Sequence, residues 1–392
     1  MGSFDRPRGS VDRGPDRPRE HGLPADEPPP PCPPLPGGMT RRECYDRYTA
    51  EYEILWGRGI GDPLDTRGAM PGDAGRARGL ADAVRISDND EGTRLGKLDF
   101  ATDRRPGSPD VHGRPLDRPD GTRTPLFDGN PARDQVQQGR LGDCGVITAI
   151  GAVAGHSPRA IRDRIREADD GNYEVRLHEA AYDSQSRSWK PTGRETTLTV
   201  TPDLPVSSRR PDQPAFASSG TAAVAWPSIL EKALAGIDRT WTDSRRADWE
   251  ERWPRQCEHE GREVTPAPKE YERLHEGTTA GDWAEILTQL TGRPAVTRAL
   301  PGDHKAREDT TISGDVMLTE RFRGLLDSGR PILVGTRPLD EGEVQLPHKL
   351  NPGHAYEVIR VDDENKLHLR NPWGRLHPEP MTAQQLREGI SP

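Results

Sequence analysis

The chain has 392 residues, of which 31% are hydrophobic and 30% are charged, and it contains 41 glycines and 39 prolines. This composition predicts that part of the chain does not bury enough apolar surface to fold. The formal net charge of −9 argues against a nucleic-acid partner. The cysteines form no CxxC pair, so neither a disulfide scaffold nor a structural zinc site is expected; they are Cys32, Cys44, Cys144 and Cys257.

The sequence carries no targeting or membrane segment that we recognise. The N-terminal residues MGSFDRPRGSVDRGPDRPRE lack the apolar stretch of a secretory signal peptide. No segment reaches the ~18 apolar residues that a membrane-spanning helix needs. We therefore expect a cytoplasmic protein with no membrane partner, and export by a route without a cleaved signal stays open.

Residues 1–125 are expected to be mostly disordered. Residues 1–38 are a mixture of Pro, Arg, Asp and Gly that ends in EPPPPCPPLPGG, a composition typical of disordered or polyproline-like segments. Residues 59–125 return to Gly, Asp, Arg and Pro and are interpreted as a linker.

Between these two stretches, residues 39–58 have an apolar pattern of their own. Tyr45, Tyr48, Tyr52 and Leu55 recur at helical spacing, which predicts one short helix. Such a helix is either a local element or a docking segment for a partner, and the sequence does not identify that partner.

From residue 126 to the C-terminus the pattern becomes that of a folded domain. We expect helices at 144–156, 225–237, 282–292 and 321–329, strands at 172–183, 195–206 and 331–336, and a β-hairpin at 353–374. Helices gathered early and strands gathered late favour an α+β core in two lobes. The stretch 240–270 looks like an insertion and is expected to be a solvated loop.

Cys144 is the candidate nucleophile. It stands where the turn QQGRLGDC enters an apolar helix, and Asp143 is in the position of an N-cap residue. The free amide groups and the positive dipole end of a helix favour a thiolate over a thiol, and the thiolate is the reactive form. The alternative for this residue alone is a buried structural cysteine.

The hairpin supplies a partner for a thiol. If its turn lies near Asp362, His354 at the start of one strand and Asn371 at the end of the next are neighbours. In a Cys-His-Asn site the imidazole takes the thiol proton, and the amide oxygen fixes the ring. Trp373 is expected to shield the His–Asn bond from water. Taken singly, a surface histidine and a turn asparagine are the alternatives.

Five segments resemble the signatures of calpain-type, papain-like cysteine proteases, and they occur in the family's order: QGRLGDC, WPSILEKALA, YERLHEGTT with LTQLTG, GHAYEV and LRNPWG. The resemblance covers about residues 130–375. It implies an α+β, two-lobed papain-like core, with Cys144 in a helical lobe and His354 and Asn371 in an antiparallel β lobe. It also implies a cysteine endopeptidase that hydrolyses protein or peptide substrates through an acyl-enzyme.

The resemblance assigns one further role. Gln138, six residues before Cys144, would be the oxyanion-hole donor alongside the Cys144 backbone amide. A neutral amide on the turn that leads into the helix can point at a developing oxyanion.

The sequence departs from the family's pattern in two respects. Gly145 stands where the family has Trp, which is expected to remove a bulky wall of the cleft. We find no C2-like or EF-hand segment: in residues 87–100, Leu98 falls where an EF-hand loop needs Glu. Calcium regulation therefore rests on the resemblance alone. No cofactor is required for the chemistry, and no metal-ligand set is expected.

Three other functions are compatible with these residues. Acyl transfer of the transglutaminase kind also uses a thiolate and a His, but it usually pairs that His with Asp, so Asn371 counts against it. A catalytically silent, calpain-like interaction module is favoured by Gly145. An effector or toxin protease would use the long polar N-terminal region for delivery.

Overall fold

The structure is a computed structural model that describes residues 52–56, 93–100, 108–259, 261–276, 278–307 and 310–390. For 52–56, 259, 304–307 and 310–312 it describes the backbone alone.

The described chain contains runs of consecutive strands separated by one or more helices. The strands are β1 (Tyr52–Trp56), β2 (Thr93–Leu95), β3 (Val111–Gly113), β4 (Ile165–Glu167), β5 (Tyr173–Asp183), β6 (Ser188–Val200), β7 (Leu204–Val206), β8 (Ala295–Ala299), β9 (His304–Arg307), β10 (Thr310–Ile312), β11 (Ile332–Gly335), β12 (Ala355–Val361) and β13 (Leu367–Arg370). The helices are α2 (Cys144–His156), α3 (Pro158–Arg162), α4 (Trp226–Gly236), α5 (Asp243–His259), α6 (Glu270–Glu276), α7 (Ala280–Thr291), α8 (Gly314–Asp327) and α9 (Ala383–Ile390). Single 3₁₀ turns are η2 (Arg133–Gln135), η3 (Gly220–Ala222), η4 (Ile237–Thr240) and η5 (Pro347–Lys349). The α+β class is confirmed.

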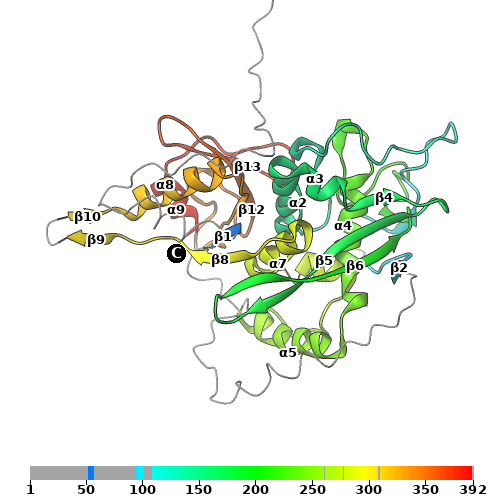
Figure 1. The fold of residues 1–392 in the computed structure, drawn as a ribbon, viewed down its shortest axis with the longest axis horizontal. Coiled ribbons are helices and arrows are strands. Elements are labelled where there is room, and N and C mark those ends of the chain that lie inside the picture. The colour runs from blue at the N-terminus through cyan, green and yellow to red at the C-terminus, as the bar shows by residue number, and fades with distance from the viewer. Residues whose placement is uncertain are drawn as a thin grey trace, which may run out of the picture.

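One mixed sheet runs through the molecule in the order β13-β12-β11-β1-β8-β6-β5-β4, with β2 paired to β6. Strand β1 is parallel to both of its neighbours, β11 and β8, whereas β11, β12 and β13 pair antiparallel. In Figure 1, β1 lies between the part of the molecule that contains β12, β13 and α8 and the part that contains α7, β5 and β6. This short strand therefore joins the two halves of the sheet.

Strand β1 corrects the prediction of a helix over residues 39–58. Residues 52–56 form a strand, and the rest of that range lies outside the described residues. The segment YEILW contains Tyr, Ile and Trp, which fit strands well, and it gains backbone pairing on both edges. This pairing with distant segments overrides the local helical spacing.

Two apolar cores flank the β11–β12 part of the sheet. Leu333 and Ala355 pack into the larger core, which includes α2, α4 and α7. Val334 and Tyr356 belong to the smaller core, together with α8 and α9. Because successive side chains on a strand point to opposite faces, each of these strands contributes to both cores. Helix α2, which begins at Cys144, and helix α8 thus cover opposite faces of the same two strands.

The sequence placed the start of the folded region at residue 126, but the structure shows folded segments before that residue. Leu95, Leu98 and Leu116 lie in the range expected to be disordered, yet they are buried in the larger core. Strand β2 also pairs with β6. The composition of this range misled the prediction because a few apolar side chains, spaced far apart, carry its packing.

The stretch 240–270 is also not a solvated loop. It contains α5, and the buried Trp249, Trp253 and Cys257 form a small core of their own. Guanidinium groups cover the indoles, as Arg252 lies 4.8 Å from the ring centre of Trp249. The high charge of this segment concealed a helix whose apolar residues are mostly tryptophan.

The four predicted helices are present: α2 has the predicted ends, whereas the ends of α4, α7 and α8 are shifted. Helix α7 begins at a capping box made by Thr279 and Asp282, and it ends at Gly292, whose φ of 66° is the left-handed conformation expected of a C-terminal glycine. Helix α8 starts at Gly314, seven residues before the predicted start. Among the described residues, no helix is long and apolar enough to cross a membrane.

Leu98 tests whether the segment before residue 126 belongs to the folded domain. Leu98 is 0% exposed, so Leu98→Ala in the full chain should lower the free energy of unfolding by about 2–5 kcal/mol. The matched control is Leu376→Ala: Leu376 is 71% exposed, and its loss should change stability by no more than about 0.5 kcal/mol. Urea denaturation measures both, and equal stabilities would contradict the buried position of Leu98.

Candidate active site

Cys144 is the first residue of α2, as predicted. From Gly145 to Ala154 every residue of this helix is buried, so the helix runs through the core and is accessible only at its two ends, one of which is Cys144. The backbone amide of Ala355, the residue after His354, hydrogen-bonds the Cys144 thiol. The thiol therefore faces the start of β12, where the predicted histidine lies.

The electrostatics at Cys144 differ from the expectation. The pKa of the thiol is raised to about 11. Burial is the largest cause of this rise in pKa, the amide of Ala355 opposes it, and the Asp143 carboxylate adds to it. The helix start therefore does not by itself produce a thiolate in this state. The sequence could not show this because the burial of the sulfur depends on packing between distant segments.

Asp143 does not cap α2 with its side chain, although it occupies the N-cap position. Asp143 is 0% exposed, and its carboxyl group interacts with the carboxyl of Glu231 on α4; as an ionised group, it has no hydrogen-bond partner for either oxygen among the described residues. Since an ionised carboxylate has no donor, a hydrogen bond between these two groups requires a proton on one of them. Burial raises the pKa of Asp143 to about 7, and burial together with the Asp143 charge raises the pKa of Glu231 well above its usual value. An acid pair thus lies directly behind the candidate nucleophile.

His354 and Asn371 meet across the hairpin. His354 Nε2 and Asn371 Oδ1 are 3.0 Å apart, and both residues are buried. The Asn371 amide is oriented by two further bonds, because Oδ1 also accepts from the Trp373 N–H and Nδ2 donates to the Leu376 carbonyl. Since the Asn371 oxygen faces the ring, His354 Nε2 carries the proton and Nδ1 is the free acceptor.

The hairpin register differs slightly from the one assumed from the sequence. Glu357 pairs with Arg370 and Val358 with Leu369, and a bulge follows at Ile359. His354 is therefore not directly opposite Asn371 but is displaced by two positions along the ladder. The Asn371 side chain bridges this offset because the chain leaves the strand after Arg370 and turns.

Two aromatic rings enclose the imidazole. The ring of Trp373 lies 4.8 Å from the ring of His354, measured between centres, and Tyr356 contacts it edge-on at 5.0 Å. Burial lowers the pKa of His354, whereas the bond from Asn371 raises it. Trp373 thus lies where the sequence placed it, against the imidazole that bonds Asn371.

Gln138 lies on the turn before α2. Its backbone N–H donates to the Pro372 carbonyl at 2.9 Å, which connects the turn to the residue after Asn371. Its side-chain Nε2 donates to the Leu141 carbonyl at 2.7 Å. The amide group therefore lies near the beginning of α2, with one N–H already engaged within the turn.

The sequence suggested that Gly145 would leave a gap beside Cys144, but the structure shows that this space is filled. The indole of Trp283 on α7 packs against it so closely that a Cβ on residue 145 would come within 1.9 Å of the ring. Trp283 is 3% exposed. A tryptophan from another helix thus fills the space beside the candidate nucleophile, and the sequence offered no signal for this because residues 145 and 283 are far apart in the chain.

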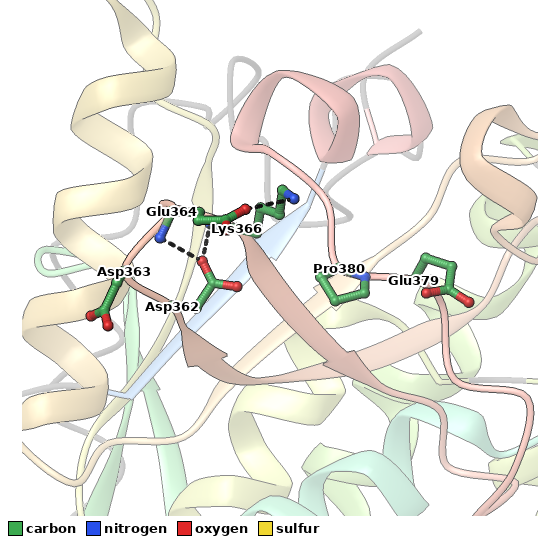
Figure 2. Close-up of a pocket in the computed structure, with 6 residues that line it drawn as sticks. All are labelled: Asp362, Asp363, Glu364, Lys366, Glu379 and Pro380. Atoms are coloured by element: carbon green, nitrogen blue, oxygen red, sulfur yellow. Dashed lines mark hydrogen bonds and ion pairs between the residues drawn. The ribbon is translucent and has the colours of Figure 1, made fainter.

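A hollow at the turn of the β12–β13 hairpin gathers acidic side chains, as Figure 2 shows; it is lined by Asp362, Asp363, Glu364, Lys366, Glu379 and Pro380. Asp362 Oδ1 already accepts the backbone N–H groups of Glu364 and Lys366, and its Oδ2 bonds His368. This turn lies at the opposite end of the hairpin from His354. Across the described ranges, no group of three or more His, Cys, Asp or Glu residues is arranged to hold a metal ion.

Comparison of the whole chain with known proteins yields no matching family and no matching curated protein. The geometry therefore carries the functional argument.

The His354–Asn371 bond can be tested by titration. Because the Asn371 oxygen raises the pKa of His354, Asn371→Ala should lower that pKa, and Asn371→Asp should raise it by adding a negative charge. Nuclear magnetic resonance of the histidine side chains measures both shifts, with His112 on β3 as the internal reference. An unchanged His354 midpoint in both variants would mean that the bond is absent in solution.

The acid pair predicts a pH-dependent stability. A buried acid whose folded pKa is raised stabilises the fold at low pH and loses this effect as pH rises through the folded pKa, here about 7. Asp143→Asn should therefore gain stability relative to the wild type between pH 5 and pH 8, by on the order of 1 kcal/mol or more.

The control for this prediction is Asp282→Asn. Burial alone would raise the pKa of Asp282, but Arg252 and Thr279 outweigh it, so the net shift is downward. Its stability difference from the wild type should accordingly stay constant between pH 5 and pH 8. Urea denaturation at several pH values measures both variants, and a pH-independent difference for Asp143→Asn would rule out the shared proton.

Proposed function

We propose that this chain is a cysteine endopeptidase of the calpain type that hydrolyses peptide bonds in protein or peptide substrates. The observation that carries the proposal is the buried 3.0 Å contact between His354 Nε2 and Asn371 Oδ1, next to a cysteine at a helix start. The imidazole is held by an amide, its other nitrogen is a free acceptor, and the next residue, Ala355, bonds the thiol. This arrangement suits a Cys-His-Asn site.

The elements that carry these residues fit a papain-like arrangement, in which one lobe provides the cysteine and the other provides the histidine and asparagine. Helix α2 belongs to the larger core and carries Cys144, whereas the antiparallel strands β11, β12 and β13 lead to His354 and Asn371. The two sides meet where α2 packs on β12, and Thr148 Oγ1 on α2 lies 3.5 Å from the Ala355 carbonyl. We therefore propose the two-lobed papain-like fold on the arrangement of its site.

The first half of the proposed reaction forms an acyl-enzyme. The thiol proton of Cys144 moves to His354 Nδ1 as the sulfur attacks the substrate carbonyl carbon, and Asn371 holds the resulting imidazolium. The Cys144 backbone N–H and an N–H of Gln138 Nε2 stabilise the oxyanion. The C–N bond then breaks, and His354 returns its proton to the leaving amine. A thioester remains on Cys144.

The second half releases the product. Water gives a proton to His354 Nδ1 and attacks the thioester carbonyl, and Cys144 leaves as the thiolate, which takes the proton back. Both halves need a neutral imidazole at the start. The lowered pKa of His354, which follows from its burial, favours that form near neutral pH.

The raised pKa of Cys144 favours a second candidate, a catalytically silent module that binds proteins. With the pKa at about 11, the resting site holds a thiol, and no ion pair exists before attack. The endopeptidase needs proton transfer during attack, whereas the silent module needs no reaction at all. Hydrolysis of a protein substrate by the wild type, dependent on Cys144, separates the two.

Cysteine substitutions test the proposed activity in the full chain. Cys144→Ser should abolish hydrolysis of a protein substrate such as casein, because an alcohol at this position is a far weaker nucleophile. Cys257→Ser is the matched control and should keep full activity, since Cys257 is 0% exposed within the tryptophan cluster. Fluorescence of labelled casein fragments reports the activity.

Alkylation of the same variants identifies the reactive thiol. Iodoacetamide should label Cys144 before Cys257 in the folded protein, as seen by mass spectrometry of the digested protein. Cleavage of casein by the Cys144→Ser variant would sink the proposal. Labelling of Cys144 without casein cleavage by the wild type would favour the silent module.

A further inference from the structure

A cluster of buried charged side chains lies behind the proposed triad and takes no part in the reaction described above. Glu357 on β12 is 0% exposed and lies 3.2 Å from the Arg133 guanidinium. His156, at the end of α2, lies 3.7 Å from the same carboxylate oxygen. Burial lowers the pKa of His156 to about 3, so it is neutral here. Arg370 on β13 also interacts electrostatically with Glu357.

Arg370 connects this cluster to the segment that carries Gln138. Its guanidinium donates to the carbonyl oxygens of Arg133 and Val136, the latter at 2.6 Å. Both acceptors belong to the turn that leads to Gln138. Arg370 is 6% exposed, so these bonds are shielded from competing water.

The two residues after Arg370 extend the same connection. Asn371 bonds His354, and the Pro372 carbonyl accepts the Gln138 backbone N–H at 2.9 Å. The three consecutive residues 370–372 therefore bond both the imidazole of His354 and the turn that carries Gln138. Displacing Arg370 would shift the turn relative to Asn371.

Arginine suits this role better than lysine. The two carbonyls are three residues apart in the chain, and a planar guanidinium presents several N–H donors in fixed directions. A lysine ammonium is a single point of charge on a flexible stem. The buried carboxylate of Glu357 keeps the guanidinium charge compensated.

We infer that Arg370 is a positioning residue for the oxyanion hole, which holds the turn carrying Gln138 in register with Asn371 and with the start of α2. The inference rests on the proposed endopeptidase function. Arg370 touches no reacting atom in this mechanism, and it acts through the carbonyls of Arg133 and Val136.

Arg370→Lys in the full chain tests the inference through two different reactions of Cys144. Peptide hydrolysis forms an oxyanion, whereas alkylation by iodoacetamide does not. The kcat for a fluorogenic peptide should fall by roughly 10- to 100-fold, since a displacement of about 1 Å in an active site has effects of this size. KM and the alkylation rate should each stay within about threefold of the wild type.

Gln138→Ala provides the second arm. Loss of one oxyanion donor reduces kcat by about 10²–10³-fold. If Arg370 acts through Gln138, then Arg370→Lys should cause little further loss in the Gln138→Ala background, because the two residues serve one interaction. Multiplicative losses in the double variant would overturn the inference.

Arg323→Lys is the matched control. Arg323 clamps the far end of the same hairpin, where it donates to Asn365 Oδ1 at 2.8 Å and to the Asp362 carbonyl. It should leave kcat unchanged. If Arg370→Lys fails to fold, as judged by circular dichroism, Arg370→Gln replaces it, because the neutral amide keeps donors and leaves Glu357 paired with Arg133.

The outcomes distinguish a failure of the proposed endopeptidase function from a failure of the positioning role of Arg370. A wild-type chain that hydrolyses no peptide overturns the proposed function and, with it, the positioning role. An active wild type whose Arg370 variants keep full kcat overturns the positioning role alone. An equal fall in kcat and in the alkylation rate would also overturn it, since Arg370 would then act on the thiol or on His354.

Discussion

Strand β12 is packed on both of its faces, and its two-residue alternation determines where each group of the site lies. Ala355 and Glu357 face α2, while Tyr356 and Val358 pack with α8. A slip of one residue would move the Glu357 carboxylate into the apolar core under α8. The cost of burying an unpaired charge there is large, so the register of β12 is strongly specified. His354 takes its position from this register, at the point where the strand begins.

The parts of the fold that depend on local sequence were predictable. The β12–β13 hairpin closes through a short turn, so the pairing of His354 with Asn371 followed from strand alternation and loop length, apart from an offset of two positions. The strand β1 was not predictable in this way. Its partners are about 240 and 280 residues away in the chain, and local spacing in YEILW carries no information about them. The tryptophan core of α5 was missed for a related reason, because its arginines hide the apolar residues from any average over composition.

The same distinction applies to the site. The positions of Cys144, His354, Asn371 and Trp373 follow from a helix start and a hairpin, both of which are local. The contact of Trp283 with Gly145 requires that α7 pack on α2, and the Asp143–Glu231 bond requires that α4 approach the same helix start. Neither approach leaves a mark in the sequence near residue 144. The pKa of the thiol depends on such packing contacts between distant segments. This is why the sequence predicted a lowered thiol pKa, whereas the structure raises it.

A buried acidic side chain lies near each end of α2: Glu357 near the negative C-terminal end of the helix dipole and Asp143 at the positive N-terminal end. At the C-terminal end, Glu357 is compensated by Arg133 and Arg370, so its charge is held away from the thiol. At the N-terminal end, an ionised Asp143 would itself occupy the positive end of the dipole, and its charge raises the pKa of Cys144. When Asp143 is protonated, its charge no longer occupies the positive end of the dipole and no longer raises the pKa of Cys144. In the proposed reaction, the amide groups of the first turn would then interact with a thiolate or an oxyanion without competition from the Asp143 charge. Protonation of Asp143 would therefore remove one of the contributions that raise the pKa of Cys144, whereas the larger contribution, from burial of the sulfur, would remain.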